Sequence, residues 1–230
     1  MNIMKLAVLL LTTAGILSTA CGKETDATTK AAGMRDEDSY PGEITEYEGV
    51  KLSAMNDFRE NSIKGPQKVD TSEYRLEISG LLDSVRSYTF KQVIEGFTSY
   101  KRVLLMKCVE GWDLKLLWEG VRIIDLLEDT GVKEDAKTVI FHSVDGYTTS
   151  MPLSYVRGKD LLLAYKINDV VLPPERGFPF MLAAEGKWGY KWAKWVERIE
   201  LSADTTYRGF WESRGYSNDG SDDQPFFDSP

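Results

Sequence analysis

The sequence predicts an α+β fold in which strands outnumber helices. Residues 74–80 and 195–201 alternate apolar and polar side chains, which is the pattern of strands with one buried face. Apolar residues at helical spacing occur in two short stretches, 89–95 and 122–130. Because these stretches do not alternate strictly with the strands, we expect mixed sheets with short helices and not a parallel βαβ architecture.

Start and stop signals delimit the elements along the chain. Thr89 can cap the first helix, and Gly131 can end the second. Residues 103–106 form a short apolar run, which predicts a buried strand leading to Cys108. Further strands are predicted at residues 138–141 and 161–165. Turns are predicted at Asp145-Gly146 and Pro173-Pro174.

The N-terminal segment has the features of a lipoprotein signal peptide. Residues 1–20 contain Lys5, an apolar run and small residues before Cys21. The apolar run is shorter than the ~20 residues that a membrane span needs. We therefore expect a lipid anchor on Cys21 and a location at the membrane of the cell envelope, outside the cytoplasm.

A single domain is expected between two polar segments. Residues 21–48 lack apolar periodicity and predict a flexible tether, and residues 219–230 predict a solvated acidic tail. The remaining residues, 49–218, suffice for one well-buried core. The formal net charge of -8 argues against nucleic acid as a partner and against electrostatic adhesion to anionic lipid.

Cys108 is a cysteine without an expected disulfide partner. The chain has two cysteines, and a lipid would consume the sulfur of Cys21. Cys108 is then a lone thiol in a chain that we expect to be exported. Such a thiol is either a buried, inert side chain or a thiolate held for chemistry, and the residues alone leave both interpretations open.

Four segments, in order, resemble motifs of the sulfite oxidase superfamily, in the form found in its small bacterial members and in periplasmic methionine-sulfoxide reductases. They are residues 108–112 (Cys-Val-Glu-Gly-Trp) with 118–121, residues 163–179, residues 187–195 and residues 211–216. The resemblance implies the molybdopterin-binding fold of that superfamily, in a single domain, and an oxidoreductase activity.

The resemblance also implies a cofactor and the residues that perform the chemistry. Molybdenum would be bound by the Cys108 thiolate and by the dithiolene of molybdopterin, which is consistent with the preference of thiolates for soft, sulfur-rich metal centres. Tyr216 would place a hydroxyl near the metal. Glu110 would line the approach of the substrate, although a structural salt bridge is an equal alternative for it.

Further residues match cofactor-binding positions of the superfamily. They are Arg59, Glu60, Asn61, Ser143, Arg176, Trp192, Ala193 and Lys194. Lys194 falls in the stretch that holds the phosphate of the pterin. For Arg59 and Glu60 an ordinary surface role is an equal alternative. The other tryptophans, Trp112, Trp118, Trp188 and Trp195, are expected to belong to the core.

Two departures from the superfamily pattern bear on the substrate. Met181 stands where larger relatives carry a cofactor-binding arginine, and Asp113 stands where sulfite-oxidising members place an arginine. A carboxylate would repel sulfite, so we expect a small substrate of the sulfoxide or oxyanion class, with sulfite the less favoured. Because no haem domain is recognised, a separate electron-transfer partner is expected. A monomer is expected because no second domain of the kind that eukaryotic relatives use to dimerise is recognised.

An alternative function class remains open from the sequence. Molybdopterin enzymes usually cross the membrane folded, with a twin-arginine signal, and residues 1–5 contain no arginine. A cofactor-free, lipid-anchored binding protein on the same fold is therefore the alternative hypothesis.

Overall fold

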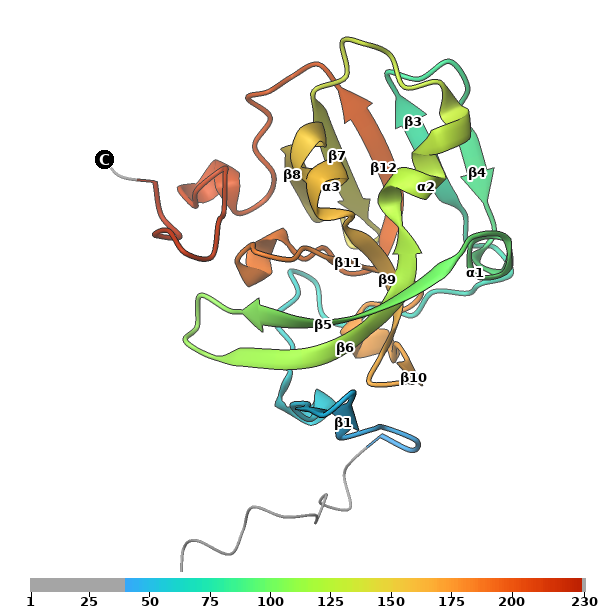
Figure 1. Cartoon of the computed structure of the whole chain (residues 1–230). Coiled ribbons are helices and arrows are strands. Elements are labelled where there is room, and N and C mark those ends of the chain that lie inside the picture. Colours follow the sequence, from blue (N-terminus) through green and yellow to red (C-terminus); the bar gives the residue numbers. More distant parts are fainter. Residues whose placement is uncertain (1–39, 229–230) are drawn as a thin grey trace, which may run out of the picture. The chain divides into compact units, whose positions relative to one another are not determined.

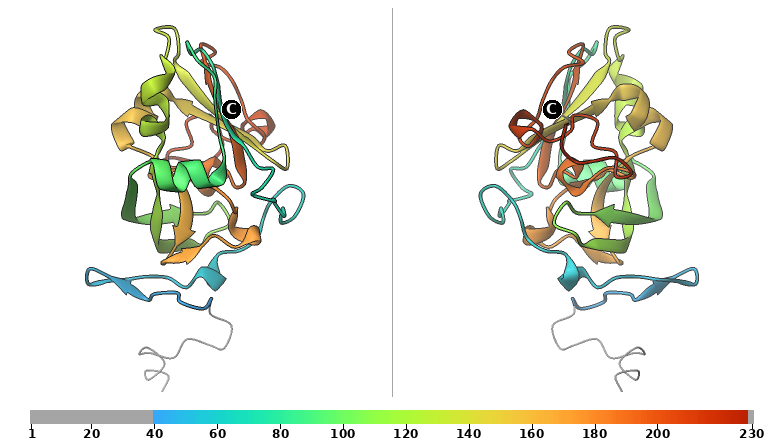
Figure 2. Two further views of the ribbon diagram at one scale, coloured as in Figure 1. Left: turned by 90° about the vertical axis from the view of Figure 1, so that its right-hand side faces the viewer. Right: turned by 90° about the vertical axis from the view of Figure 1, so that its left-hand side faces the viewer.

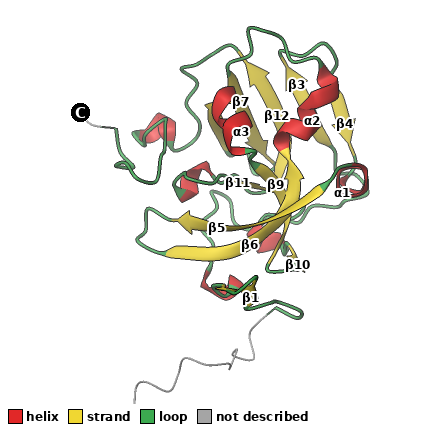
Figure 3. Ribbon diagram, in the orientation of Figure 1, coloured by secondary structure: helices red, strands yellow, loops and turns green. Residues whose placement is uncertain are grey.

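Strands form most of the domain, and the helices are short and peripheral (Figure 3). The computed structural model describes residues 40–228, so the expected signal peptide and most of the expected tether lie outside the described residues. The three α-helices are α1 (Phe90–Gly96), α2 (Ile123–Leu127) and α3 (Leu153–Lys159). The predicted α+β class is confirmed, with mixed sheets and few helical residues.

The first sheet is antiparallel and carries a hairpin whose turn begins at Cys108 (Figure 1). Its order is β10-β9-β6-β5, and β11 also pairs with β9. The strands are β5 (Ser99–Lys107), β6 (Asp113–Arg122), β9 (Leu162–Ile167), β10 (Val170–Val171) and β11 (Met181–Ala183). The predicted strand at 103–106 is confirmed within β5, but its burial on both faces is not, because β5 is an edge strand in which Leu105 is 37% exposed.

The second sheet mixes parallel and antiparallel pairs in the order β4-β3-β12-β7-β8. Its strands are β3 (Leu76–Gly80), β4 (Arg86–Tyr88), β7 (Thr138–Ser143), β8 (Thr148–Pro152) and β12 (Val196–Ser202). Strand β12 lies parallel to β3 and antiparallel to β7. The predicted strands at 74–80, 138–141 and 195–201 are thereby confirmed within two residues at each end.

Local signals behave as the sequence predicts. Thr89 caps α1 in a capping box, in which its side chain accepts from the backbone N–H of Gln92 at 3.1 Å. Helix α2 continues into a 3-10 turn, Glu128–Thr130, and ends at Gly131, whose φ of 67° is left-handed.

The apolar core holds the loops of the two sheets in place. Trp118 of β6 is fully buried and packs on Trp192, with ring centroids 5.0 Å apart. Large aromatic side chains contribute much of the apolar area that a core removes from water. This contact joins the first sheet to the segment 188–195, which follows β11 and returns the chain to β12 (Figure 2).

The domain is longer at both ends than the sequence predicts. The backbone N–H of Ile44, in the expected tether, donates to the Asn168 carbonyl at 3.1 Å. Residues 40–51 include the small hairpin of β1 (Glu46–Tyr47) and β2 (Val50–Lys51). At the other end, the N–H of Trp188 donates to the Gly220 carbonyl at 2.8 Å, so the expected solvated tail is ordered against the domain. None of the helices in residues 40–228 is long and apolar enough to span a membrane.

Candidate active site

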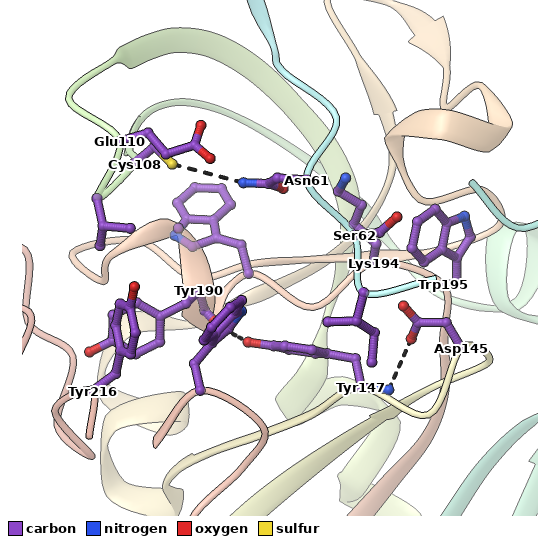
Figure 4. A pocket seen from close by; sticks show the side chains of 15 residues that line it. Asn61, Ser62, Cys108, Glu110, Asp145, Tyr147, Tyr190, Lys194, Trp195 and Tyr216 are labelled. Carbon is purple, nitrogen blue, oxygen red and sulfur yellow. Dashed lines mark hydrogen bonds between the residues drawn. The ribbon is translucent and has the colours of Figure 1, made fainter. Parts of the chain in front are cut away.

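A cavity of about 240 Å³ opens beside the β5–β6 turn and is lined by six of the residues singled out from the sequence (Figure 4). Cys108 and Glu110 lie at one end, and Lys194 and Asp145 lie at the other. The lining residues are Asn61, Ser62, Ile63, Cys108, Val109, Glu110, Asp145, Tyr147, Gly189, Tyr190, Trp192, Lys194, Trp195, Trp211 and Tyr216.

A tight turn presents Cys108 to the cavity. The N–H of Cys108 donates to the Trp112 carbonyl at 2.8 Å, and the N–H of Gly111 donates to the Cys108 carbonyl at 3.1 Å. Gly111 has a φ of 84°, which favours glycine at this point of the turn. The indole N–H of Trp112 holds the Glu110 carboxylate at 2.9 Å. The turn thus fixes both the sulfur and the neighbouring carboxylate.

The Cys108 thiol has a polar environment despite its burial. The residue is 5% exposed and forms no disulfide in the described part of the chain. Burial raises the pKa of the thiol, whereas the backbone N–H groups of Glu110 and Val109 act to lower it. The side-chain amide of Asn61 also donates toward the sulfur, at 3.9 Å. These donors would stabilise a thiolate bound to a metal.

Buried positive charge gathers at the opposite end of the cavity. Lys194 is 8% exposed, and its Nζ lies 2.6 Å from Glu60 Oε2. Burial lowers the pKa of Lys194, and the Glu60 partner opposes that shift. The Arg176 guanidinium, equally buried, lies 5.1 Å above the ring of Phe58, and the Lys194 amine lies 5.5 Å above the same ring. Two cations therefore lie close together with a single carboxylate bonded to Lys194.

Two buried polar atoms, one of them on Arg176, have no hydrogen-bond partner among the described residues. Ser143 Oγ and Arg176 Nε are buried and make no hydrogen bond within residues 40–228. Asp145, on the turn after β7, lines the cavity and is 2% exposed, and burial raises the pKa of its carboxyl. Leaving such atoms unpaired costs about 1–3 kcal/mol each. Asp145 is the one of these three residues that lines the cavity.

An aromatic wall closes the Cys108 end. The ring of Tyr216 lies 5.1 Å from that of Tyr190 and 5.3 Å from that of Trp211, between ring centroids. The hydroxyl of Tyr190 donates to the Ser217 carbonyl at 2.8 Å, whereas that of Tyr216 has no hydrogen-bond partner among the described residues. Tyr216 is thus the aromatic residue of this wall whose hydroxyl is available to a bound molecule.

The structure brings together some of the residues proposed from the sequence and separates others. Cys108, Glu110, Tyr216, Asn61, Trp192 and Lys194 line the cavity. The other five are not among its lining residues: Ser143, Arg176 and Ala193 are buried, and Arg59 and Glu60 are exposed. The Ala193 carbonyl accepts from the Leu182 N–H at 2.8 Å. Their roles as cofactor ligands remain predictions.

Sequence reasoning missed part of the lining. Asp145 was interpreted as a turn residue, although a polar turn directly after a strand that ends at Ser143 could have indicated a site. Trp195 was assigned to the core, but it has a positive φ of 52° and also lines the cavity. Tyr190 lies within the motif at residues 187–195 but was not singled out there, and Tyr147, in the turn before β8, carries no signal in the sequence.

The arrangement fits a cofactor with a phosphate at one end and a metal at the other. Lys194 and Asp145 line the cavity, so the first can pair with a phosphate and the second can accept from ring N–H donors, while Arg176 adds positive charge nearby. In residues 40–228 no three histidine, cysteine or acidic side chains gather as a metal site. A metal at Cys108 would then take its other ligands from the cofactor. Met181 stands where larger relatives carry a cofactor-binding arginine. Arg176 and Lys194 would supply the positive charge that a methionine lacks.

Comparison with known proteins gives consistent matches. A sequence model of the family described as oxidoreductase molybdopterin binding domain matches residues 63–211. The chain is 37% identical over 152 residues to YuiH, an uncharacterized oxidoreductase of Bacillus subtilis, with 66% of the chain and 76% of YuiH covered. It is 27% identical over 185 residues to the protein-methionine-sulfoxide reductase catalytic subunit MsrP of Gluconobacter oxydans, with 70% and 59% covered.

A solved structure shares the fold. The sulfane dehydrogenase SoxCD of Paracoccus pantotrophus superposes with a TM-score of 0.58 at 24% sequence identity, covering 61% of this chain and 41% of the matched chain. The chain therefore spans less than two thirds of MsrP and of the SoxCD chain.

Proposed function

This chain belongs to the family of molybdopterin-binding oxidoreductase domains, and from that premise we propose that it reduces a small, neutral sulfoxide. The net reaction takes two electrons and two protons, converts the sulfoxide to a thioether and releases its oxygen as water. The resemblance to the sulfite oxidase superfamily is confirmed, and the alternative of a cofactor-free binding protein is not supported.

The residues present fit the cofactor that the family implies, molybdopterin with molybdenum. Cys108 would bind the metal, and the cations at the other end of the cavity would hold the phosphate. Asn61, Lys194 and Asp145, which line the cavity, would offer an amide, a cation and a carboxylate to the polar groups of the pterin. When bound, the cofactor supplies the two-electron oxygen-transfer chemistry, and the protein orients the substrate and manages its protons.

The charge around Cys108 is the observation that carries the choice of substrate. The carboxylate of Glu110 lines the cavity at this end, and Asp113 is exposed at the start of β6. The nearest lysine along the chain, Lys107, lies 3.4 Å from Asp222, and Lys194 is at the far end with Glu60. An anion such as sulfite would meet the like charge of Glu110, which the smaller opposing effect of Arg59 near Cys108 offsets only in part, whereas a neutral sulfoxide would not be repelled.

Replacing Glu110 with glutamine should relax this discrimination. We expect kcat/KM for sulfite oxidation to rise about tenfold relative to sulfoxide reduction, because one like charge near the substrate is removed. The measurement is steady-state kinetics with both substrates, beside Glu95→Gln on the exposed side of α1 as the matched control. An unchanged ratio between the two substrates would contradict the role given to Glu110.

Replacing Tyr216 with phenylalanine should slow turnover without loss of metal. Removing a hydroxyl that positions or protonates the leaving oxygen is expected to lower kcat by roughly 10- to 100-fold, since a general acid contributes about that much or more. Molybdenum content and single-turnover rates should be measured together. Wild-type kinetics in this variant would exclude the hydroxyl from the reaction.

The function itself is tested on full-length protein from a host that makes molybdopterin. Near-stoichiometric molybdenum and reduction of dimethyl sulfoxide by a dye reductant are the expected results. Metal without sulfoxide turnover, but with sulfite oxidation, would reverse the substrate assignment. Absence of metal, while the same host loads a relative, would contradict the proposal.

The cellular setting extends this proposal. We infer that lipid on Cys21 anchors the chain outside the cytoplasm and that a separate protein delivers the electrons. The pattern of residues 1–21 supports the first inference. The two electrons that each sulfoxide reduction consumes support the second. Radiolabelled palmitate should label the wild type but not Cys21→Ser.

A further inference from the structure

Residues 217–228, called here the C-terminal segment, contact each of three chain segments that line the Cys108 end of the cavity. The segment follows Tyr216 directly and folds back against the domain (Figures 1 and 2). The sequence predicted a solvated acidic tail at this place. In the structure the segment instead packs against the domain through backbone hydrogen bonds, aromatic rings and ion pairs.

The first contact is with the turn that carries Cys108. Lys107, the residue before Cys108, places its Nζ 3.4 Å from Asp222 Oδ2 and 3.5 Å from the Asp222 carbonyl. Asp222 is in turn fixed by its N–H, which donates to the Gly186 carbonyl at 3.1 Å. The end of β5 is thereby tied to the C-terminal segment.

The second contact is with the loop that contributes Gly189 and Tyr190 to the cavity. The indole N–H of Trp188 donates to the Gln224 carbonyl at 2.9 Å, and its ring meets Phe226 edge-on at 5.7 Å between centroids. The backbone N–H of Trp188 bonds the Gly220 carbonyl. The segment thus holds both the backbone and the side chain of this loop residue.

The third contact surrounds Tyr216 itself. The Ser217 N–H donates to the Phe226 carbonyl at 2.9 Å, and the Asp228 N–H donates to the Gly215 carbonyl at 3.2 Å, so the backbone is paired on both sides of Tyr216. Its ring lies 4.7 Å from that of Phe227. Arg208 closes this arrangement, because it donates to the Tyr216 carbonyl at 3.0 Å and pairs with Asp228.

We propose that the C-terminal segment positions Tyr216 over the Cys108 end of the cavity, with Phe227 and Arg208 as positioning residues. A side chain acts on a reacting atom only when it is held within about 0.5 Å of the productive geometry by its neighbours. Half-buried Tyr216 has no hydroxyl partner among the described residues to hold it, so the segment supplies that restraint. This inference rests on the proposed function for its kinetic consequence.

The test uses two substitutions in the full-length protein, Phe227→Ala and Arg208→Gln, and one shortened chain that stops after Pro225. Asp223→Asn is the matched control, because Asp223 lies in the same segment, is exposed, and makes no hydrogen bond or ion pair in the described structure. For each we would measure molybdenum content, kcat and KM for dimethyl sulfoxide, and the rate at which iodoacetamide alkylates Cys108 in cofactor-free protein.

The expected result is unchanged molybdenum content, with kcat/KM lowered about tenfold through misplacement of Tyr216. Alkylation of Cys108 should become several-fold faster, and Asp223→Asn should match the wild type. If Phe227→Ala keeps wild-type kinetics and alkylation, the proposal is overturned, whatever the fate of the shortened chain. Loss of molybdenum in proportion to activity would also overturn it, since the segment would then be merely structural.

The two proposals fail in distinguishable ways. If the wild type carries no metal or does not reduce sulfoxides, the proposed function fails. Faster alkylation in Phe227→Ala and Arg208→Gln would still support the positioning of this wall, and unchanged alkylation would overturn it.

Discussion

Replacing Cys108 with serine is expected to abolish sulfoxide reduction and to remove most of the bound molybdenum. Cys108 is the one cysteine in residues 40–228, and no cluster of other metal-ligating side chains exists in that part of the chain to replace it. A serine hydroxyl is a hard, weakly acidic ligand, whereas the thiolate is soft and suits a sulfur-ligated metal. Changes in the surroundings of metal ligands already cost 10- to 100-fold, so we expect more than ~100-fold loss of kcat here.

The measurement combines molybdenum analysis, the visible absorption spectrum and turnover of dimethyl sulfoxide. Cys21→Ser is the matched control, because it makes the same chemical change at the other cysteine. It should keep metal and turnover in detergent-solubilised protein. Turnover by Cys108→Ser at the wild-type rate would show that the sulfur is not a ligand and would leave the interpretation of Cys108 as an inert core thiol.

Replacing Lys191 with methionine is expected to destabilise the domain by about 3–5 kcal/mol. Lys191 and Glu212 are both fully buried, and their charged atoms are 2.7 Å apart. Lys191 Nζ also donates to the carbonyls of Ser150, at 3.0 Å, and Asn218, at 2.6 Å, so all three of its protons are used. Methionine would leave the Glu212 carboxylate buried with only Thr149 Oγ1, at 2.5 Å, as a side-chain donor.

Chemical denaturation and thermal melting would measure this loss, which corresponds to a fall in Tm of roughly 10 °C for a domain of this size. The double variant Lys191→Met/Glu212→Leu should regain most of the stability, because removing both charges leaves none uncompensated. Lys91→Met breaks the exposed pair with Glu95 and should cost less than about 1 kcal/mol. A single variant at Lys191 as stable as the wild type would contradict the stabilising role given to the buried pair.

The Lys191–Glu212 pair also connects the two segments that form the aromatic wall. Lys191 follows Tyr190, and Glu212 follows Trp211, and both aromatic residues line the cavity. Stability and site geometry therefore depend on the same buried contact. A Lys191 variant that folds should show altered turnover as well as a lower Tm.

The local elements could be predicted because their signals are local. Thr89 and Gly131 bound the two predicted helices, and alternation of apolar residues identified β3 and β12. Strand β6 was missed, although it pairs with both β5 and β9. Its central residues, Leu116 to Val121, are all buried, so it lacks the alternation that marks a strand with one exposed face.

Charge pairing could not be predicted in the same way. Lys194 and Glu60 are 134 positions apart in the chain, and Lys191 and Glu212 are 21 apart. A lysine in sequence looks the same whether it is solvated or buried against a carboxylate, since the difference lies in its distant partners. For the same reason the acidic residues of the C-terminal segment read as a solvated tail.

The sequence by itself determined the α+β class, the helix caps and, through motifs in a fixed order, Cys108 and the family. Those features depend on side-chain periodicity and on short spacings that a single chain displays. Only the tertiary structure decided which side chains line the cavity, that Arg176 and Ser143 are buried outside that lining, and that residues 217–228 contact the segments around Tyr216. The physical reason is that burial and pairing arise from contacts between residues far apart in the chain, which exist only once the two sheets have packed.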